Sequence, residues 1–212
     1  MRQASMRKEA DMADSPASKR DAILAAATRV FLDQGYGAAS MDAIARTAGV
    51  SKQTIYAHFG GKAALFEATV LERSNRLLEP FPAETDSLHD PEAALRAIAR
   101  RFLDLILSPE TVGRFRVIVA ESGRFPELAE AFYRSGPERV GGRLSGYLAE
   151  LHQRGIVRVT DPRTASIHFF GMVRGDLFLR QLLGLGEPPL APERNRIVDS
   201  AVKAFLSAYA PT

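Results

Sequence analysis

The chain has 212 residues and no cysteine, which allows one large domain or a small domain joined to a larger one and excludes disulfides and thiolate metal sites. Residues 1–62 hold nine Lys and Arg against six Asp and Glu, so the whole net charge of +3 lies in this part, either as a polyanion-binding feature or as ordinary variation. No apolar run approaches the roughly 18 residues of a membrane span, which indicates a soluble cytoplasmic protein without a membrane partner.

The first 62 residues contain a pattern of short helices. Residues 1–17 lack hydrophobic periodicity and are expected to form a disordered arm. Apolar residues recur at helical spacing from Ser18 to Gln34, and Gly35 ends this first helix. Two helices of about two turns follow, because Ser40 and Ser51 stand at N-cap positions and Gly49 stands at the turn between them. The pattern predicts a three-helix, helix-turn-helix DNA-binding domain over residues 18–60.

The outward edge of the last of these helices is polar. Its exposed positions are occupied by hydrogen-bonding side chains, namely Lys52, Gln53, Thr54, Tyr56 and His58. Side chains of this kind reach base edges and phosphates in a major groove of DNA. This helix is therefore the predicted recognition element.

The remaining chain, residues 61–212, is predicted to form a larger helical domain. A fourth helix covers about 62–78 and is closed by Pro80 and Pro82, and a loop covers 81–89. Further helices are expected at about 90–107, 110–121, 126–154, 162–184 and 192–210. No strand pattern appears, so the predicted fold is all-α with about nine helices.

The sequence contains no pattern typical of an enzyme. Gly60-Gly61-Lys62 resembles a phosphate loop only superficially, because Tyr56 replaces the first glycine and Ala63 replaces the Ser or Thr. Ser145 lies between glycines at the wrong spacing for a nucleophile elbow. The four histidines have no metal-ligand spacing. We therefore predict no catalytic residue, metal or cofactor.

Several motifs of the first 70 residues resemble the N-terminal domain of the TetR family of bacterial transcriptional repressors. They are Ile23–Ala27, Val30-Phe31, Gly35-Tyr36, Ser40–Lys52, Thr54-Ile55-Tyr56, His58-Phe59, Lys62 and Leu65-Phe66. The C-terminal part is similar to the AefR-like branch of that family, through Glu121–Leu128, Arg154-Gly155 and Asp161-Pro162.

The resemblance implies a role for particular residues. We expect Lys52, Gln53 and Thr54 to carry sequence choice and Ser40, Tyr56, His58 and Lys62 to hold phosphates, whereas Ser51 is a helix cap or a DNA contact. An effector cavity is implied in the larger domain, with Phe102, Phe115, Val119, Phe132, Phe169 and Met172 as its candidate lining. A helical domain of this size also needs such side chains to fill its core, so each one taken singly suits the core better than a ligand contact. Family members dimerise through their last two long helices, and the candidate interface residues are Phe170, Val173, Leu177, Val198, Val202 and Phe205. The core of the single chain needs one such apolar row on each helix as well, so the sequence does not assign the faces.

The sequence thus predicts a homodimeric repressor that binds a palindromic DNA operator and is released by a small apolar or amphipathic effector. An activator or a regulator without a ligand remains an alternative within regulation. A helical enzyme or small-molecule carrier that uses the aromatic interior is an alternative from another class. Retention of selected DNA sequences in a salt-sensitive manner distinguishes the DNA reader from these last two.

Overall fold

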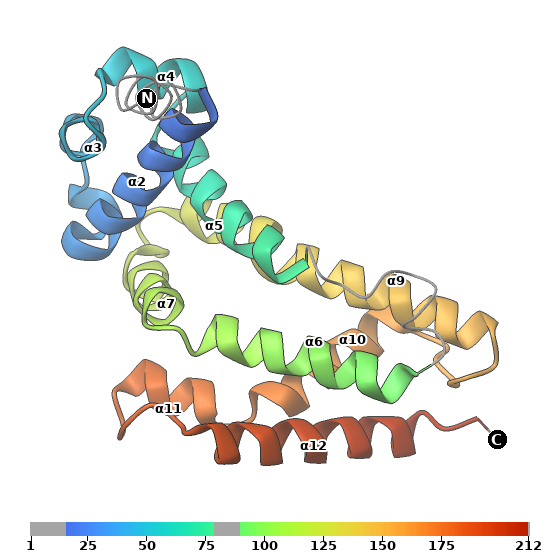
Figure 1. Cartoon of the computed structure of the whole chain (residues 1–212). Helices are drawn as coiled ribbons and strands as arrows, with labels where there is room; N and C mark the ends of the chain where they lie inside the picture. The colour runs from blue at the N-terminus through green and yellow to red at the C-terminus, as the bar shows by residue number, and fades with distance from the viewer. Residues whose placement is uncertain (1–15, 79–89, 212) are drawn as a thin grey trace, which may run out of the picture. The chain divides into compact units, whose positions relative to one another are not determined.

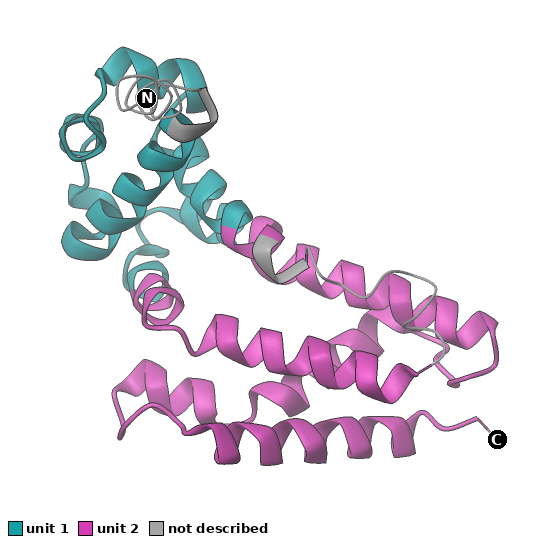
Figure 2. Cartoon of the chain, in the orientation of Figure 1, with its two compact units in different colours: residues 1–72, 117–132 teal, residues 73–116, 133–212 magenta. Residues whose placement is uncertain are grey.

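The computed structural model describes residues 16–78 and 90–211, and every regular element in these ranges is a helix (Figure 1). The chain divides into two compact units (Figure 2). Unit 1 comprises the chain through Glu72 together with Val117–Phe132, and unit 2 comprises Arg73–Arg116 and the chain from Tyr133 onward. Within the described ranges, no helix has the length and apolar character needed to cross a membrane. The all-α prediction is confirmed.

Unit 1 contains four helices from the start of the chain. They are α2 (Pro16–Ala38), α3 (Met41–Ala48), α4 (Lys52–Phe59) and α5 (Lys62–Leu78), of which α5 belongs to this unit through Glu72. The backbone of α2 is interrupted at Gly35, where φ is 77° and ψ is 165°. Glycine has no Cβ and adopts this conformation without strain, which is why the first helical run turns here.

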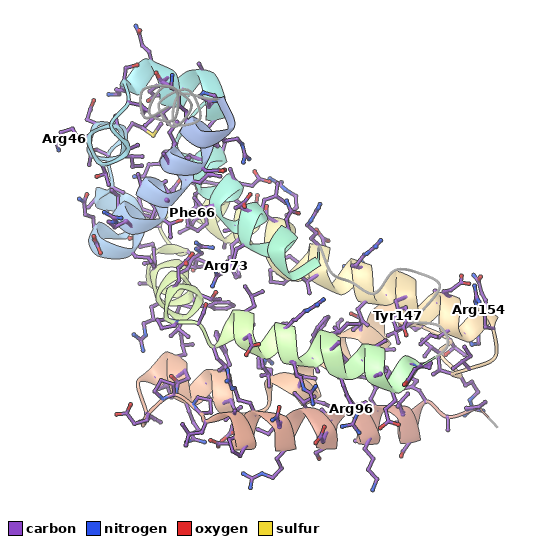
Figure 3. All side chains as sticks on the ribbon, viewed as in Figure 1. Arg46, Phe66, Arg73, Arg96, Tyr147 and Arg154 are labelled. Carbon is purple, nitrogen blue, oxygen red and sulfur yellow. The ribbon has the colours of Figure 1, made fainter. Side chains whose placement is uncertain are left out.

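The core of unit 1 is built around three aromatic rings. Phe31 and Tyr36 of α2 lie with their ring centroids 5.7 Å apart, and Phe66 of α5 meets both rings edge to face at 5.4 and 5.6 Å. Figure 3 labels Phe66 on the side of α5 that faces α2. Ile44 of α3 and Ile55 of α4 are also fully buried in this core. Since α3 and α4 are too short to be stable alone, this shared core holds them.

Unit 2 is formed mainly by the later helices. Their bounds are α6 (Pro91–Ile106), α7 (Pro109–Glu121), α8 (Pro126–Tyr133), the π-helical turn η1 (Arg134–Glu138), α9 (Arg139–Gln153), α10 (Pro162–Arg174), α11 (Leu177–Leu183) and α12 (Ala191–Ala208). The end of α7 and most of α8 belong to unit 1. Asp90 and Asp161 cap α6 and α10 by accepting hydrogen bonds from backbone N–H groups of the first turn.

The core of unit 2 lies among α6, α9, α10 and α12. Phe169 and Phe205 are fully buried, with ring centroids 5.2 Å apart, and Leu144 and Leu148 of α9 are buried beside them. Two ion pairs join α6 to α12 at the surface. Arg96 of α6 contacts Asp199 of α12, and Arg194 of α12 lies 2.8 Å from Asp104 of α6. Arg96 extends from α6 in Figure 3.

Several predicted boundaries are corrected by the structure. The first helix begins at Pro16, inside the predicted arm of residues 1–17. The rest of that arm, residues 1–15, lies outside the described ranges, and so do Pro80, Pro82 and the predicted loop 81–89. The compact unit that contains the helix-turn-helix also includes residues through Glu72 and Val117–Phe132, and the DNA-binding domain of residues 18–60 stays a prediction. The predicted helix 162–184 is two helices, because Gly175 adopts φ 48° and ψ −140° between α10 and α11. The predicted helix 126–154 contains a π-helical turn at Pro137, which has no N–H for an α-helical bond.

Candidate nucleic-acid interface

Serine hydroxyls and left-handed glycines define the ends of α3 and α4. Ser40 Oγ accepts a hydrogen bond from the Ala43 N–H, and Ser51 Oγ accepts one from the Thr54 N–H, each at 3.1 Å. Gly49 ends α3 with φ 68°, and Gly60 ends α4 with φ 78°. These conformations place the two helices in the tight bend that the sequence pattern predicts.

One face of α4 is buried and the opposite face is open. Ile55 is fully buried and Phe59 packs against the core of unit 1. Gln53, Tyr56 and His58 are exposed, with 45% of Tyr56 accessible. The three side chains therefore remain available to a ligand outside the protein. Thr54 is half-buried, and its hydroxyl lies 2.8 Å from Ser51 Oγ, so both hydroxyls take part in the helix cap.

Lys52 forms an ion pair that was not among the predictions from the sequence. Its ammonium donates to Asp42 Oδ2 at 2.9 Å across the bend between α3 and α4. The hydrogen bond to Asp42 raises the pKa of Lys52. Both side chains are exposed, so such a pair is weak and can open when a phosphate competes for the ammonium. Acidic and basic residues at the first turns of the two helices were a signal that could have revealed it.

Other polar side chains surround the same helices. Arg46, in the last turn of α3, is exposed, and Figure 3 shows it extending away from the helices of unit 1. Thr47 is exposed as well, although its hydroxyl donates to the Ala43 carbonyl at 2.9 Å. Neither residue was among the predicted DNA contacts. Arg46 adds a positive charge beside α4.

Lys62 and Ser40 approach the interface from its edges. Lys62 Nζ donates to the Gly37 carbonyl at 3.1 Å and lies 4.6 Å from the centroid of the Tyr36 ring. Burial lowers the pKa of Lys62, and the nearby Glu121 partly offsets this effect. Ser40 is exposed at the start of α3, three residues after Gly37. The predicted phosphate contacts Ser40 and Lys62 thus share one stretch of supporting backbone.

The candidate effector residues are divided between the units. Val119 and Phe132 belong to unit 1, and the other four belong to unit 2. Phe102 and Phe115 are half-buried and lie against Phe170 and Phe178 at centroid distances of 4.4 and 4.7 Å. Phe169 is fully buried in the core, whereas Val119 is 66% exposed and Met172 is 39% exposed. The six side chains therefore do not form one lining within either unit.

Five of the six predicted dimer residues lie in the interior of the single chain. Each of the five is at most 1% exposed and belongs to the core of unit 2; they are Val173, Leu177, Val198, Val202 and Phe205. Phe170 is half-buried and packs against the same core. These apolar rows, which were candidates for the interface, fill the interior of the single chain, which needs one such row on each helix. Large apolar side chains instead remain exposed at Ile167, Leu179, Leu183, Leu185 and Leu190.

The described residues show no group of three or more His, Cys, Asp or Glu side chains that could hold a metal ion. What the unit 1 geometry does contain is a short helix with an exposed polar face, held by capped ends and a bend against a preceding helix. This arrangement defines a helix-turn-helix DNA-binding protein.

Comparison with known proteins identifies the family. Residues 23–69 match the family described as bacterial regulatory proteins, tetR family, and residues 93–211 match the C-terminal domain of AefR-like transcriptional repressors. The chain belongs to the TetR family of bacterial transcriptional regulators, whose named relatives here are regulators rather than enzymes.

Relatives and solved structures agree with this assignment. The chain is 39% identical over 88 residues to the transcriptional activator FasR of Mycolicibacterium smegmatis, covering 42% of this chain and 40% of FasR. It is 32% identical over 113 residues to the regulator UidR of Escherichia coli K12, covering 52% and 55% of the two chains. The chain thus matches only about half the length of these relatives or less.

Solved structures match almost the whole chain, and two of them are similar in sequence as well. The flavonoid-responsive regulator FrrA is 38% identical, with a TM-score of 0.76, and the match covers 92% of this chain and 98% of FrrA. A structure from Mesorhizobium loti, assigned to the TetR family, is 32% identical with a TM-score of 0.77 and the same coverage.

Proposed function

We propose that this protein is a homodimeric regulator that recognises a palindromic DNA operator with α4 and responds to a small molecule. The observation that carries the proposal is the exposed polar face of α4, where Gln53, Tyr56 and His58 point away from the core. Gln53 supplies a side-chain amide that can pair with an adenine edge, while Tyr56 and His58 supply groups for phosphates. Lys52 joins them when its exposed pair with Asp42 opens.

The proposed DNA-binding protein is a dimer, so a second copy of the chain must bind the first. Leu179 and Leu183 are four residues apart on α11, so they share one face, and they are 55% and 62% exposed. Ile167 adds an exposed apolar side chain on α10, and Gly171 lies one helical turn after it. Exposed apolar side chains of this size favour a self-complementary contact between two copies. Such a dimer presents two copies of α4 to successive major grooves, roughly 34 to 36 Å apart.

The direct test is selection of DNA from a random duplex library by the full-length protein. The selected sequences are expected to form an inverted repeat whose half-site centres are separated by about 10 base pairs or a multiple of one helical turn. The Gln53→Ala/Tyr56→Ala double variant is the matched control, because both side chains are exposed on α4. Wild-type protein that enriches no sequence at moderate salt would overturn the proposal.

The direction of regulation is proposed to be repression. The match of residues 93–211 to AefR-like repressors supports this direction, whereas the name of FasR favours activation as the second candidate. A reporter gene with the selected operator inside its promoter separates the two. Repression predicts higher reporter expression when the regulator is deleted, and activation predicts lower expression.

The effector is proposed to be a small apolar or amphipathic compound that binds unit 2. FrrA is named as flavonoid-responsive, and the half-buried rings of Phe102 and Phe115 offer aromatic contacts for a planar compound. A panel of flavonoids is therefore the first probe. A compound that binds the free protein more tightly than the DNA-bound protein raises the melting temperature of the free protein. The same compound must weaken operator binding, because linkage makes the effects of compound and operator on each other's affinity reciprocal. A panel without either effect would favour a ligand-independent regulator.

A further inference from the structure

The motif Glu121–Leu128 lies far from the helix-turn-helix in sequence but belongs to the same compact unit. Glu121 is the last residue of α7, and its Oε2 accepts a hydrogen bond from the Gly37 N–H at 2.5 Å. Four residues later, the ring of Phe125 meets the ring of Tyr36 edge to face, with centroids 5.3 Å apart. Two side chains of this motif therefore hold the connection between α2 and α3.

The connection is shaped to fit the carboxylate. A Cβ atom on Gly35 would collide with Glu121 Oε1, and a Cβ atom on Gly37 would lie only 2.9 Å from Oε2 and 3.1 Å from the Phe125 ring. Real Cβ atoms essentially never lie within 3.0 Å of a neighbouring atom, so a side chain at either position would displace the Glu121 carboxylate or the backbone. The two glycines thus create the space into which the carboxylate fits.

Lys62 binds the backbone carbonyl of Gly37. Glu121 accepts from the Gly37 N–H, and Lys62 Nζ donates to the Gly37 carbonyl at 3.1 Å. Both backbone hydrogen-bonding groups of Gly37 are therefore bound by side chains distant in sequence. Burial raises the pKa of Tyr36, and Glu127 and Glu121 raise it further, which agrees with carboxylates close to this connection.

We propose that Glu121 is a positioning residue for DNA binding, which fixes Gly37 and through it the placement of Ser40 and Lys62 at the DNA phosphates. This inference rests on the proposed function. Glu121 is not itself a DNA contact, since a carboxylate and a phosphate repel each other. It acts because Gly37 precedes the N-cap of α3 by three residues and binds Lys62 directly. Without Glu121, the connection is free to move, and Lys62 loses its fixed position.

The test measures how operator binding by the full-length protein depends on salt. Each neutralised phosphate contributes about one unit to the slope of log K against log salt concentration. Glu121→Ala is expected to weaken operator binding about tenfold or more and to flatten the slope by about one unit for each DNA-binding head. A merely structural role would reduce the active fraction equally at every salt concentration and leave the slope unchanged.

Three further variants make the result specific. Glu121→Gln retains an acceptor oxygen for Gly37 and is expected to keep the wild-type slope. Glu130→Ala removes an exposed carboxylate of α8 in the same unit and serves as the matched control. The Lys62→Ala/Glu121→Ala double variant should have the slope of Lys62→Ala alone, because both changes remove the same phosphate contact. If Glu121→Ala does not fold, Glu121→Asp replaces it, because its shorter side chain places the carboxylate farther from Gly37.

Four results would overturn the inference. They are an unchanged slope or a tighter complex for Glu121→Ala, a Glu121→Gln variant as weak as Glu121→Ala, and additive slope changes in the double variant. Failure of the proposed function is distinguishable, because the wild-type protein would then enrich no operator sequence at all.

Discussion

The exposed surfaces of α4 in unit 1 and of α10 and α11 in unit 2 differ in chemistry. On α4, the open positions carry amide, phenol and imidazole groups, at Gln53, Tyr56 and His58. On α10 and α11, Ile167 is 65% exposed and Leu183 is 62% exposed. Both surfaces belong to helices whose other face is buried in a core. The comparison indicates that the exposed side chains, rather than the helices themselves, determine whether a face suits DNA or a second protein chain.

The largest expected effect concerns the apolar face. The double variant Leu179→Glu/Leu183→Lys replaces both exposed leucines with charged residues that form an i, i+4 pair and maintain the helix. Because each copy contributes two leucines, the double variant removes four leucines from a two-fold interface. Each leucine contributes about 1.5 kcal/mol or more to the free energy of dimerisation, so the dimer dissociation constant should rise at least about 10⁴-fold. Analytical ultracentrifugation over a range of protein concentrations measures this change.

Val119→Asp is the matched control for that experiment. Val119 is also apolar and 66% exposed, but it belongs to unit 1 and lies outside the proposed interface. The control should dimerise like the wild-type protein. A leucine variant that remains dimeric would show that the apolar face of α11 does not hold two copies together.

The next effect tests whether Phe205 belongs to the core of unit 2 or to a dimer interface. Phe205→Ala removes a fully buried ring that lies 5.2 Å from Phe169, and it should lower the free energy of unfolding by about 3 to 5 kcal/mol. The exposed neighbour Lys203 supplies the control, because Lys203→Ala should change stability by less than about 0.5 kcal/mol. Urea unfolding measures both variants. A small loss of stability accompanied by weaker dimerisation would place Phe205 at an interface after all.

A smaller effect concerns the polar face of α4. Gln53→Ala should cost about 1 to 3 kcal/mol in binding to the selected operator and little in binding to random duplex, because base contacts carry sequence choice. Fluorescence anisotropy with both duplexes measures the difference. Gln153→Ala, at an exposed glutamine of α9 in unit 2, should leave both affinities unchanged. Equal losses on the two duplexes would reassign Gln53 to the phosphate backbone.

The smallest effect concerns the helix caps, which also differ between the units. Hydrogen bonds from Thr164 lower the pKa of the Asp161 cap below its usual 3.8. Because the folded pKa lies below the unfolded one, the stabilisation is complete above the ordinary pKa and is lost as pH falls through the folded pKa. Asp161→Ala should therefore be less stable than wild type at neutral pH, with a difference that narrows below about pH 4.

Urea unfolding at a series of pH values measures this narrowing. Ser51→Ala is the matched control in unit 1, because a hydroxyl cap does not titrate in that range. The stability difference of this control should stay constant with pH. A constant difference for Asp161→Ala as well would mean that its carboxylate has no role in the cap.

Local signals in the sequence sufficed to predict most of the helix-turn-helix. Ser40, Gly49 and Ser51 act through backbone groups within four residues, so their types alone indicate where α3 and α4 begin and end. Contacts between distant residues left no such signal. The bond between Glu121 and Gly37 joins residues 84 positions apart, and neither residue is unusual where it stands.

The helices of unit 2 could be predicted, but not the orientation of their faces. Periodic apolar residues identify α10 and α12, yet both the core and an interface require such residues. Val202 and Phe205 thus suit either place from their spacing alone, and in the folded chain they fill the interior. Leu179 and Leu183 could not be recognised as exposed, because the break at Gly175 begins a new helix, α11.

The serine caps of unit 1 have an electrostatic consequence for DNA binding. Aligned peptide dipoles leave a partial positive charge at the N-terminus of each helix. At α6 and α10, the carboxylates of Asp90 and Asp161 neutralise that charge. At α4, the hydroxyl of Ser51 satisfies the Thr54 N–H without adding a negative charge, and the first turn of this helix has no acidic residue, whereas that of α3 contains Asp42. The N-terminus of α4 thus keeps an attractive potential for phosphate that does not depend on the position of any lysine or arginine side chain.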